Sequence, residues 1–252
     1  MRRLALIGNW KMYTTPSSAR SLALGLVERL GSIKDADIVV SPPATSLAGV
    51  GEAIANTNIA LCAQNAHWDD EGAYTGEISV KSLAELGCEY VIVGHSERRV
   101  IFKESDEMIG KRLVKVTASG LTGILCVGEK EEEREEGKTE EVLAKQMEIA
   151  LSGVQKLSII VAYEPVWAIG TGKRAEIKDI EASHRFIRKK ILNRFGKDAD
   201  NIRVIYGGSV KPENITELVS CEEVDGALIG GASLSIDSFT EIVTRAIERR
   251  IA

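Results

Sequence analysis

The clearest structural pattern in the sequence runs from residue 159 to residue 191. It begins with IIVAY at 159–163, an apolar run without polar alternation, and reaches IKDIEASHRFIRKKI at 177–191. The first run is typical of a strand buried on both faces, as in a parallel sheet. In the second, apolar residues and His184 recur at spacings of three and four, which predicts a helix with one buried stripe. The pair predicts a strand followed by a covering helix, with His184 in a packing role.

The same alternation occurs eight times along the 252 residues. The expected strands are Leu4–Gly8, Asp37–Ser41, Ile59–Ala63, Tyr90–Gly94, Gly123–Val127, Ile159–Tyr163, Arg203–Gly207 and Asp225–Ile229. Eight strand–helix units in a chain of this length fit an α/β fold of the (β/α)8 barrel type. No Pro/Gly/Ser-rich linker divides the chain, so we expect residues 1–252 to form one barrel domain.

Helix boundaries carry their own signals. The expected helix starts are Ser17, Ser105 and Pro212, and the expected stops are Gly120 and Gly196. An open doubly wound sheet is the competing architecture. Its dinucleotide fingerprint GxGxxG is absent after the first strand, where residues 8–12 read GNWKM. The barrel is therefore favoured.

The composition of the chain argues against several classes of function. The chain has 32 Lys and Arg against 37 Asp and Glu, a net charge of −5, which argues against nucleic acid or anionic membrane as a partner. No apolar run approaches the length of a membrane span, and the N-terminus turns polar too early for a signal peptide. The four cysteines have neither disulfide-scaffold nor zinc-site spacing. We expect a cytoplasmic protein.

Active sites of barrels lie at the carboxyl ends of the strands, so the residues that follow each strand are the candidates. Glu164 follows an apolar strand and precedes Pro165, a rigid position beside apolar walls that suits a general base. His95 leaves a strand and enters a short helical turn, where the positive end of the helix dipole favours a neutral ring that donates a hydrogen bond. Lys11 brings a permanent cation to the same mouth, where it is placed to neutralise a developing oxyanion.

Glycines supply the anion-binding part. Gly207-Gly208-Ser209 and Gly230-Gly231 follow the last two strands, where barrels commonly bind phosphate through backbone N–H groups. The run Gly170-Thr171-Gly172-Lys173 resembles part of a P-loop, but Trp167 and Arg174 occupy positions that such a loop gives to Gly and Ser or Thr. We interpret the segment from Pro165 to Ala175 as a lid.

These residues resemble one family, triosephosphate isomerase. The resemblance covers nearly the whole chain and is carried by the segments 8–12 (GNWKM), 63–65 (AQN), 72–79 (GAYTGEIS), 93–99 (VGHSERR), 124–129 (ILCVGE), 162–173 (AYEPVWAIGTGK), 206–209 (YGGS) and 230–233 (GGAS). It implies interconversion of dihydroxyacetone phosphate and D-glyceraldehyde 3-phosphate through an enediolate, as part of glycolysis and gluconeogenesis, without a metal or organic cofactor.

The resemblance also implies residue roles. Glu164 would move the proton between the two carbons, His95 would act as the neutral electrophile, and Lys11 would stabilise negative charge. The implied substrate-binding residues are Asn9, Lys11, Gly170, Ser209, Gly230 and Gly231. Glu97 and Cys126 match support positions, and Ser96 a partner of the base when the lid is open.

The long loop 65–78 has no helical stripe. The resemblance implies that it docks into a second subunit and carries Thr75 towards the partner's first-strand loop, so a homodimer is implied. Arg174 stands where the family is expected to have a small or Thr-like residue, which bears on lid closure and leaves the chemistry untouched.

The residues argue against three other functions. A Schiff-base aldolase requires a lysine on a barrel strand, and no expected strand contains one in its interior. A retaining glycosidase requires two carboxylates about 5 Å apart, whereas the fourth expected strand ends in His95 and the seventh in Gly208-Ser209. A non-catalytic phosphate-binding barrel predicts binding without isomerisation, and the presence of Lys11, His95 and Glu164 together argues against it.

Overall fold

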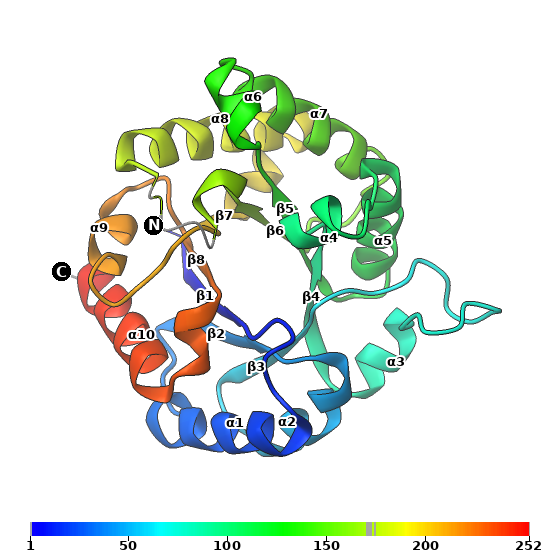
Figure 1. The fold of residues 1–252 in the computed structure, drawn as a ribbon, viewed down its shortest axis with the longest axis vertical. Coiled ribbons are helices and arrows are strands. Elements are labelled where there is room, and N and C mark those ends of the chain that lie inside the picture. Colours follow the sequence, from blue (N-terminus) through cyan, green and yellow to red (C-terminus); the bar gives the residue numbers. More distant parts are fainter. Residues whose placement is uncertain (1, 170–172, 174, 252) are drawn as a thin grey trace.

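The computed structural model describes residues 2–169, 173 and 175–251. Eight parallel strands close into a barrel in sequence order, each paired with its chain neighbour and the last with the first (Figure 1). The strands are β1 (Leu4–Asn9), β2 (Ala36–Ser41), β3 (Ile59–Ala63), β4 (Cys88–Val93), β5 (Thr122–Val127), β6 (Ile159–Tyr163), β7 (Arg203–Tyr206) and β8 (Gly226–Ile229). The predicted (β/α)8 fold class is confirmed.

Helices surround the barrel as an outer ring (Figure 1). The α-helices are α1 (Pro16–Leu30), α2 (Leu47–Ile54), α3 (Val80–Glu85), α4 (Ser96–Val100), α5 (Asp106–Ala118), α6 (Glu131–Glu135), α7 (Thr139–Leu151), α8 (Ile177–Phe195), α9 (Ile215–Ser220) and α10 (Ile236–Ile251). Short 3-10 turns are η1 (Ala44–Ser46), η2 (Val166–Ala168), η3 (Lys197–Asn201) and η4 (Gly231–Leu234). No helix within the described ranges combines the length and apolar character that a membrane crossing requires.

The predicted strands are all present, with shifted ends. Gly94, Gly207 and Asp225 lie just outside β4, β7 and β8. Gly94 adopts φ +73°, a left-handed conformation that ends the strand and turns the chain. The side chain of Asp225 accepts a hydrogen bond from the backbone N–H of Val204 at 2.9 Å. Asp225 therefore stabilises the start of the neighbouring strand β7 and is not itself part of β8.

Two of the predicted helix signals are wrong. Thr15, not Ser17, caps α1: its hydroxyl accepts the N–H of Ser18, and Pro16 is the first helical residue. Pro212 lies in a turn before α9, which begins at Ile215. The other three signals are confirmed.

In the confirmed cases the local chemistry matches the expectation. Ser105 caps α5 and accepts the N–H of Met108. Gly196 ends α8 at φ +70°, and Gly120 follows α5 at φ +88°. Both glycines take the left-handed conformation that stops a helix at low cost.

The core has two layers. Inside the barrel lie side chains such as Ile7, Val39, Ile92, Ile124 and Ile160. A larger layer joins the outer faces of the strands to the helices. The stripe of α8 faces this second layer: Ile180, His184, Ile187 and Ile191 are buried and Ile177 is half-buried, which confirms the packing role predicted for His184.

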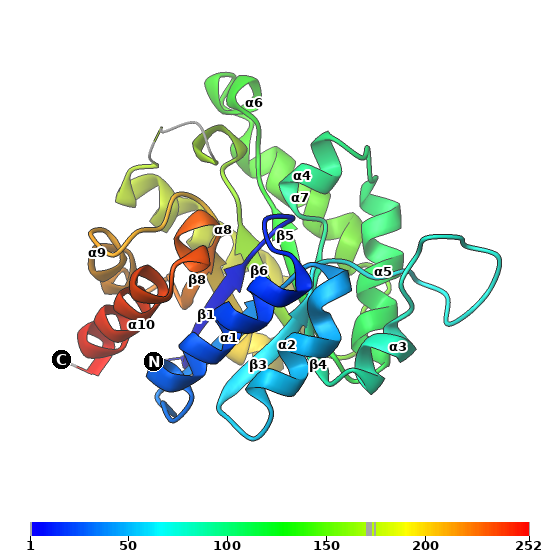
Figure 2. The same ribbon diagram turned by 60° about the horizontal axis from the view of Figure 1, so that its bottom comes forward.

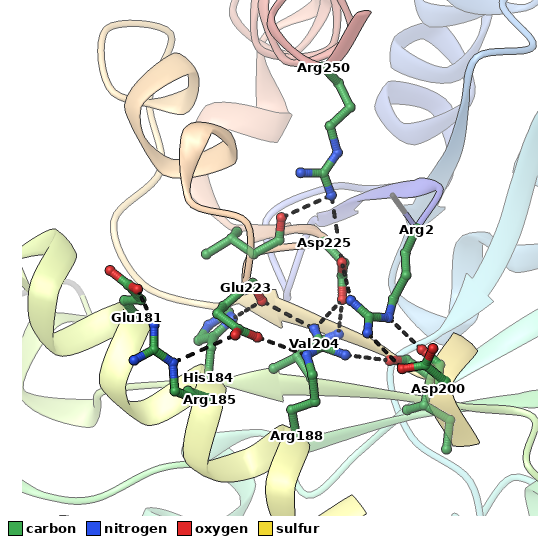
Figure 3. Close-up of polar contacts among 12 residues, drawn as sticks. Arg2, Glu181, His184, Arg185, Arg188, Asp200, Val204, Glu223, Asp225 and Arg250 are labelled. Carbon is green, nitrogen blue, oxygen red and sulfur yellow. Dashed lines mark hydrogen bonds and ion pairs between the residues drawn. The ribbon is translucent and has the colours of Figure 1, made fainter. Parts of the chain in front are cut away.

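A charged network ties together the amino ends of β7 and β8 (Figure 3). Asp225 is fully buried and accepts from Arg188 at 2.7 Å, with Arg2 and Arg250 within 3.7 Å. His184 Nδ1 lies 3.1 Å from the carbonyl of Glu223, and burial lowers the pKa of His184 to about 4. This ring is therefore neutral at physiological pH, and it also packs edge-on against the ring of Tyr163 at a centroid distance of 5.9 Å.

The segment between β3 and α3 leaves the barrel as a long arm (Figures 1 and 2). Its two sides are held together where the N–H of His67 donates to the carbonyl of Ile78 at 2.8 Å. Beside this contact, the His67 ring packs against the rings of Trp68 and Tyr74, with centroid distances of 4.3 and 4.2 Å. As predicted, the loop 65–78 contains no helix.

Candidate active site

The carboxyl ends of the strands open into one cavity of about 790 Å³. Its lining includes the described residues that the sequence predicts for the site: Asn9, Lys11, His95, Glu164, Ser209, Gly230 and Gly231. The remaining one, Gly170, lies outside the described residues, as does Arg174 in the predicted lid. Because these residues come from the ends of three strands, β1, β4 and β6, and from two glycine-rich loops, only barrel closure brings them together.

Glu164 follows β6 and is almost fully buried, with 1% of its surface exposed. Its backbone N–H donates to the carbonyl of Val127 at the end of β5, at 2.8 Å. Its Oε2 accepts the backbone N–H of Ser96 at 2.8 Å, a contact between residues 68 positions apart. The carboxylate therefore rests at the first turn of α4, where the helix dipole favours a negative charge.

Two glycines make room for this carboxylate. A Cβ at Gly128 would lie 1.7 Å from the carbonyl oxygen of Glu164, and a Cβ at Gly207 would lie 2.7 Å from its Cγ. Neither distance is tolerable for a side chain. Glycine at 128 and 207 is thus required by the close approach of the strand ends on either side of Glu164.

His95 stands immediately before α4 and is 6% exposed. Its Nδ1 accepts the backbone N–H of Glu97 at 3.2 Å, which places the ring proton on Nε2. Nε2 lies 3.0 Å from Oε1 of Glu164, but the geometry is not that of a hydrogen bond, because Oε1 receives none among the described residues. The Nε2–H group is therefore free to donate a hydrogen bond to a ligand in the cavity.

Lys11 has an unusual backbone with φ +50°. Its N–H donates to Oδ1 of Asn9 at 3.0 Å, and its carbonyl accepts from Nε2 of Gln64 at 2.7 Å. A non-glycine residue in this region costs about 1–2 kcal/mol, and the two side-chain contacts hold it there. Its ammonium lies 2.6 Å from Oε1 of Glu97, so the cation is fixed at the cavity wall.

The late glycine pairs follow β7 and β8, and both line the cavity. Gly230 precedes η4, and the hydroxyl of Ser233 donates to the carbonyl of Gly230 at 2.7 Å. Asn214 holds the other loop through its amide, which donates to the carbonyl of Ser209 at 2.9 Å. A Cβ at Gly230 would lie 3.6 Å from Cε of Lys11, so the Lys11 side chain lies next to the glycine-rich loop after β8.

The start of the predicted lid is anchored to a buried carboxyl group. Oε1 of Glu129 accepts from the Trp167 indole at 2.8 Å and from the Tyr163 hydroxyl at 3.1 Å. Burial raises the pKa of Glu129. The guanidinium of Arg134 covers the other side of Trp167 at 4.3 Å from the ring centroid. Residues 165–169 are thereby fixed relative to β5 and β6.

Cys126 occupies the barrel interior beside Glu164. Burial and the neighbouring Glu164 carboxylate raise the pKa of the Cys126 thiol well above its usual value, so this thiol stays neutral. Within the described ranges, no group of three His, Cys, Asp or Glu side chains is arranged to hold a metal ion.

Sequence reasoning missed the part that Arg99 and Gln64 play in the site. Both fall in segments that carry the family resemblance, but their contacts are with backbone carbonyls of other strands. Residue type at a strand end gives no signal for such contacts. A search for polar side chains directed from one strand end to the next could have singled them out.

A carboxylate, an imidazole ring and an ammonium line one cavity beside two glycine-rich loops. This is the arrangement of a barrel enzyme that moves protons on a small substrate. Comparison with protein families matches residues 4–246 to the family Triosephosphate isomerase. The curated Triosephosphate isomerase of Thermoanaerobacter sp. (strain X514) is 49% identical over 96% of this chain and 99% of its own length. That of Carboxydothermus hydrogenoformans is 48% identical over 98% and 100%.

The chain belongs to the triosephosphate isomerase family. It is an aldose–ketose isomerase that interconverts dihydroxyacetone phosphate and D-glyceraldehyde 3-phosphate, a step of glycolysis.

Proposed function

We propose that Glu164, His95 and Lys11 share this reaction between them. Glu164 takes a proton from the carbon next to the substrate carbonyl, which leaves an enediolate. It then returns the proton to the adjacent carbon, so that no proton is gained or lost. The placement of His95 Nε2 3.0 Å from the Glu164 carboxylate, with both lining the cavity of Lys11, is the observation that carries the proposal.

His95 and Lys11 act on the oxygens of the substrate. His95 donates the Nε2–H group to them in turn, and its neutral ring can do so without competing for the proton that Glu164 carries. The ammonium of Lys11 offsets the negative charge that develops on these oxygens, and Asn9 helps to bind the substrate. Fixed donors of this kind stabilise charge without the reorganisation that water would require.

The phosphate group of the substrate is placed at the other end of the cavity. We assign its binding to the backbone N–H groups of Ser209, Gly230 and Gly231, with Gly170 as the contribution of the lid. The position of Gly230 before η4 and the support of the Ser209 loop by Asn214 favour this assignment. Glu164 must leave the N–H of Ser96 to reach the carbon, so the observed position is a resting one.

Glu164→Asp tests the assigned base. The shorter side chain withdraws the carboxylate by about 1 Å, and a displacement of that size can lower the rate by ~10²-fold. We expect kcat in a coupled isomerase assay to fall by about this factor with a smaller change in KM. Glu213→Asp, at the outer rim of the same cavity, is the matched control and should retain the wild-type kcat. Equal activity of Glu164→Asp and wild type would remove Glu164 from the role of base.

We further propose that the protein is a homodimer assembled through the arm 65–78. Apolar side chains are exposed around the entrance to a second cavity of about 290 Å³, which lies behind Lys11 and His95. Of the exposed apolar residues, Met12 and Phe102 line this cavity, Tyr13 follows Met12, Val100 and Ile101 precede Phe102, and Tyr74 lies on the arm 65–78. Met12 is 91% exposed, and apolar surface of this extent is typical of a protein interface.

A second copy of the chain fits this surface because each copy offers both a projecting arm (Figure 2) and a cavity. The arm includes Thr75, and Lys11, His95 and Glu97 line the second cavity. In such a pair, the arm of one copy would support the first-strand loop of the other.

Ile101→Glu tests the dimer. A buried unpaired carboxylate in an interface costs about 2–5 kcal/mol, so the dissociation constant should rise by at least tenfold. Sedimentation or light scattering at low micromolar concentration should show the wild type at twice the chain mass and the variant shifted towards the single chain. Ile251→Glu replaces a slightly more exposed isoleucine at the end of α10 and should leave the mass unchanged. A wild type at the single-chain mass would end the proposal.

We place this isomerase in the cytoplasm. All four cysteines, Cys62, Cys88, Cys126 and Cys221, are free thiols, and the first three are buried. Burial raises the pKa of Cys88 to about 12. A protein with free, protonated thiols and no disulfide is typical of a reducing compartment.

A further inference from the structure

Arg99 joins three separate elements at the carboxyl end of the barrel. It lies in the last turn of α4, with 14% of its side chain exposed. Its Nε donates to the carbonyl of Gly94 at 2.8 Å, and one terminal nitrogen donates to the carbonyl of Cys126 at 3.0 Å. The other terminal nitrogen donates to the carboxylate of Asp106, the first residue of α5. A single side chain thus links β4, β5 and α5.

The geometry of these contacts requires a guanidinium. Three nitrogens in one rigid plane reach three acceptors that lie in different directions. A lysine ammonium carries the same charge on one atom and cannot span them. The charge itself is balanced by Asp106, whose side chain is 16% exposed and lies where the dipole of α5 favours an anion.

The two carbonyls that Arg99 holds adjoin the reacting groups. Gly94 directly precedes His95 and adopts φ +73°. A Cβ there would lie 3.2 Å from the guanidinium and 2.9 Å from Ile109, so glycine allows the close contact. Cys126 directly precedes Val127, whose carbonyl accepts the N–H of Glu164. Arg99 therefore fixes the backbone that precedes His95 relative to the backbone that holds Glu164 in place.

We propose that Arg99 is a positioning residue for the isomerase: its guanidinium sets the His95 ring relative to the Glu164 carboxylate. The inference rests on the roles proposed above for His95 and Glu164. Arg99 lies behind these groups and acts through them, without touching the substrate. Loss of its two carbonyl contacts frees the turn at Gly94, and a shift of about 1 Å at His95 is enough to lower the rate by ~10²-fold.

Arg188 provides a matched control at the opposite end of the barrel (Figure 3). Its side chain is 11% exposed, donates to the carboxylates of Glu223 and Asp225 at 2.9 and 2.7 Å, and donates to the carbonyl of Ile202 at 3.3 Å. It resembles Arg99 in burial and in type of partner. It does not line the active-site cavity.

The test compares Arg99→Gln and Arg99→Lys with Arg188→Gln, assayed well below their melting temperatures. For both Arg99 variants we expect kcat to fall 10- to 100-fold with KM within threefold, because the phosphate-binding loops are untouched. Arg188→Gln should lower the melting temperature and leave kcat within twofold. In a His95→Gln background, Arg99→Gln should have little further effect on kcat, since it acts through that ring.

Arg99 variants with a lower melting temperature and an unchanged kcat, as expected for Arg188→Gln, would contradict the proposal. So would a double variant whose fold-loss of kcat equals the product of the losses of Arg99→Gln and His95→Gln. If neither Arg99 variant folds, Asp106→Ala provides the test. It removes one of the three acceptors that hold the Arg99 guanidinium, so kcat should fall several-fold. An unchanged kcat would show that Arg99 has a purely structural role. Full activity of Glu164→Asp and His95→Gln would instead overturn the proposed function. Their loss of activity beside unaffected Arg99 variants would overturn this inference alone.

Discussion

Lys11→Met is expected to lower kcat/KM by ~10²–10³-fold, because it removes the fixed cation from the cavity and keeps the length of the side chain. The ammonium of Lys11 is held by Glu97 at 2.6 Å and passes beside Gly230, so it lies between the proposed reaction centre and the phosphate-binding side. Loss of its charge should therefore affect both KM and kcat. Michaelis kinetics in both directions of the isomerisation measure the two effects.

Two further variants separate charge from shape at this position. Lys11→Arg keeps a positive charge, but its planar fork does not reproduce the compact ammonium, so it should recover only part of the lost rate. Lys211→Met removes a cation from the outer rim of the same cavity and should keep kcat/KM within threefold of the wild type. Similar losses of kcat/KM in Lys11→Met and Lys211→Met would show that the rate depends on the overall charge of the cavity and that Lys11 has no specific role in the reaction.

The fold could be predicted because its signals are local. The apolar run at 159–163 and the stripe at 177–191 each report burial within one element, and the structure places both as expected. The errors came where two residues competed for one task. Thr15 and Ser17 both suit a helix cap, and the hydroxyl of Thr15 is the one that meets the N–H of Ser18.

Pro212 shows a different limit. Proline suits the first turn of a helix and also an ordinary turn, since both use a fixed φ near −65°. Here Asn214 accepts the N–H of Lys211 and donates to the carbonyl of Ser209, which stabilises a turn, so the helix begins at Ile215.

The candidate site could be predicted as a set of residue types but not as an arrangement. Strand ends in a barrel meet at one mouth, and this rule alone assigned Lys11, His95 and Glu164 to one cavity. The contact of Glu164 with Ser96, the φ of +50° at Lys11 and the contacts of Arg99 depend on how closely distant strands approach. Such distances are set by packing across the barrel, and no local pattern encodes them.

His95→Gln is expected to lower kcat by ~10²–10³-fold with a smaller change in KM. Glutamine retains an N–H donor, so the substrate can still be bound. It cannot give up a proton to an enediolate oxygen and regain it, as the imidazole ring can. The contact of Nδ1 with the N–H of Glu97 makes this argument specific, because it leaves the only ring proton on Nε2, which faces the cavity.

His184→Gln is the matched control, because His184 is also a buried ring, but it packs on α8 and is absent from the lining of the cavity. Its kcat should stay within about threefold of the wild type. Nitrogen-15 shifts of labelled His95 provide an independent check, since a neutral ring protonated at Nε2 has two clearly different ring nitrogens. Two equivalent, protonated nitrogens at neutral pH would show that His95 is a cation, and the reaction would then proceed by full proton donation from an imidazolium.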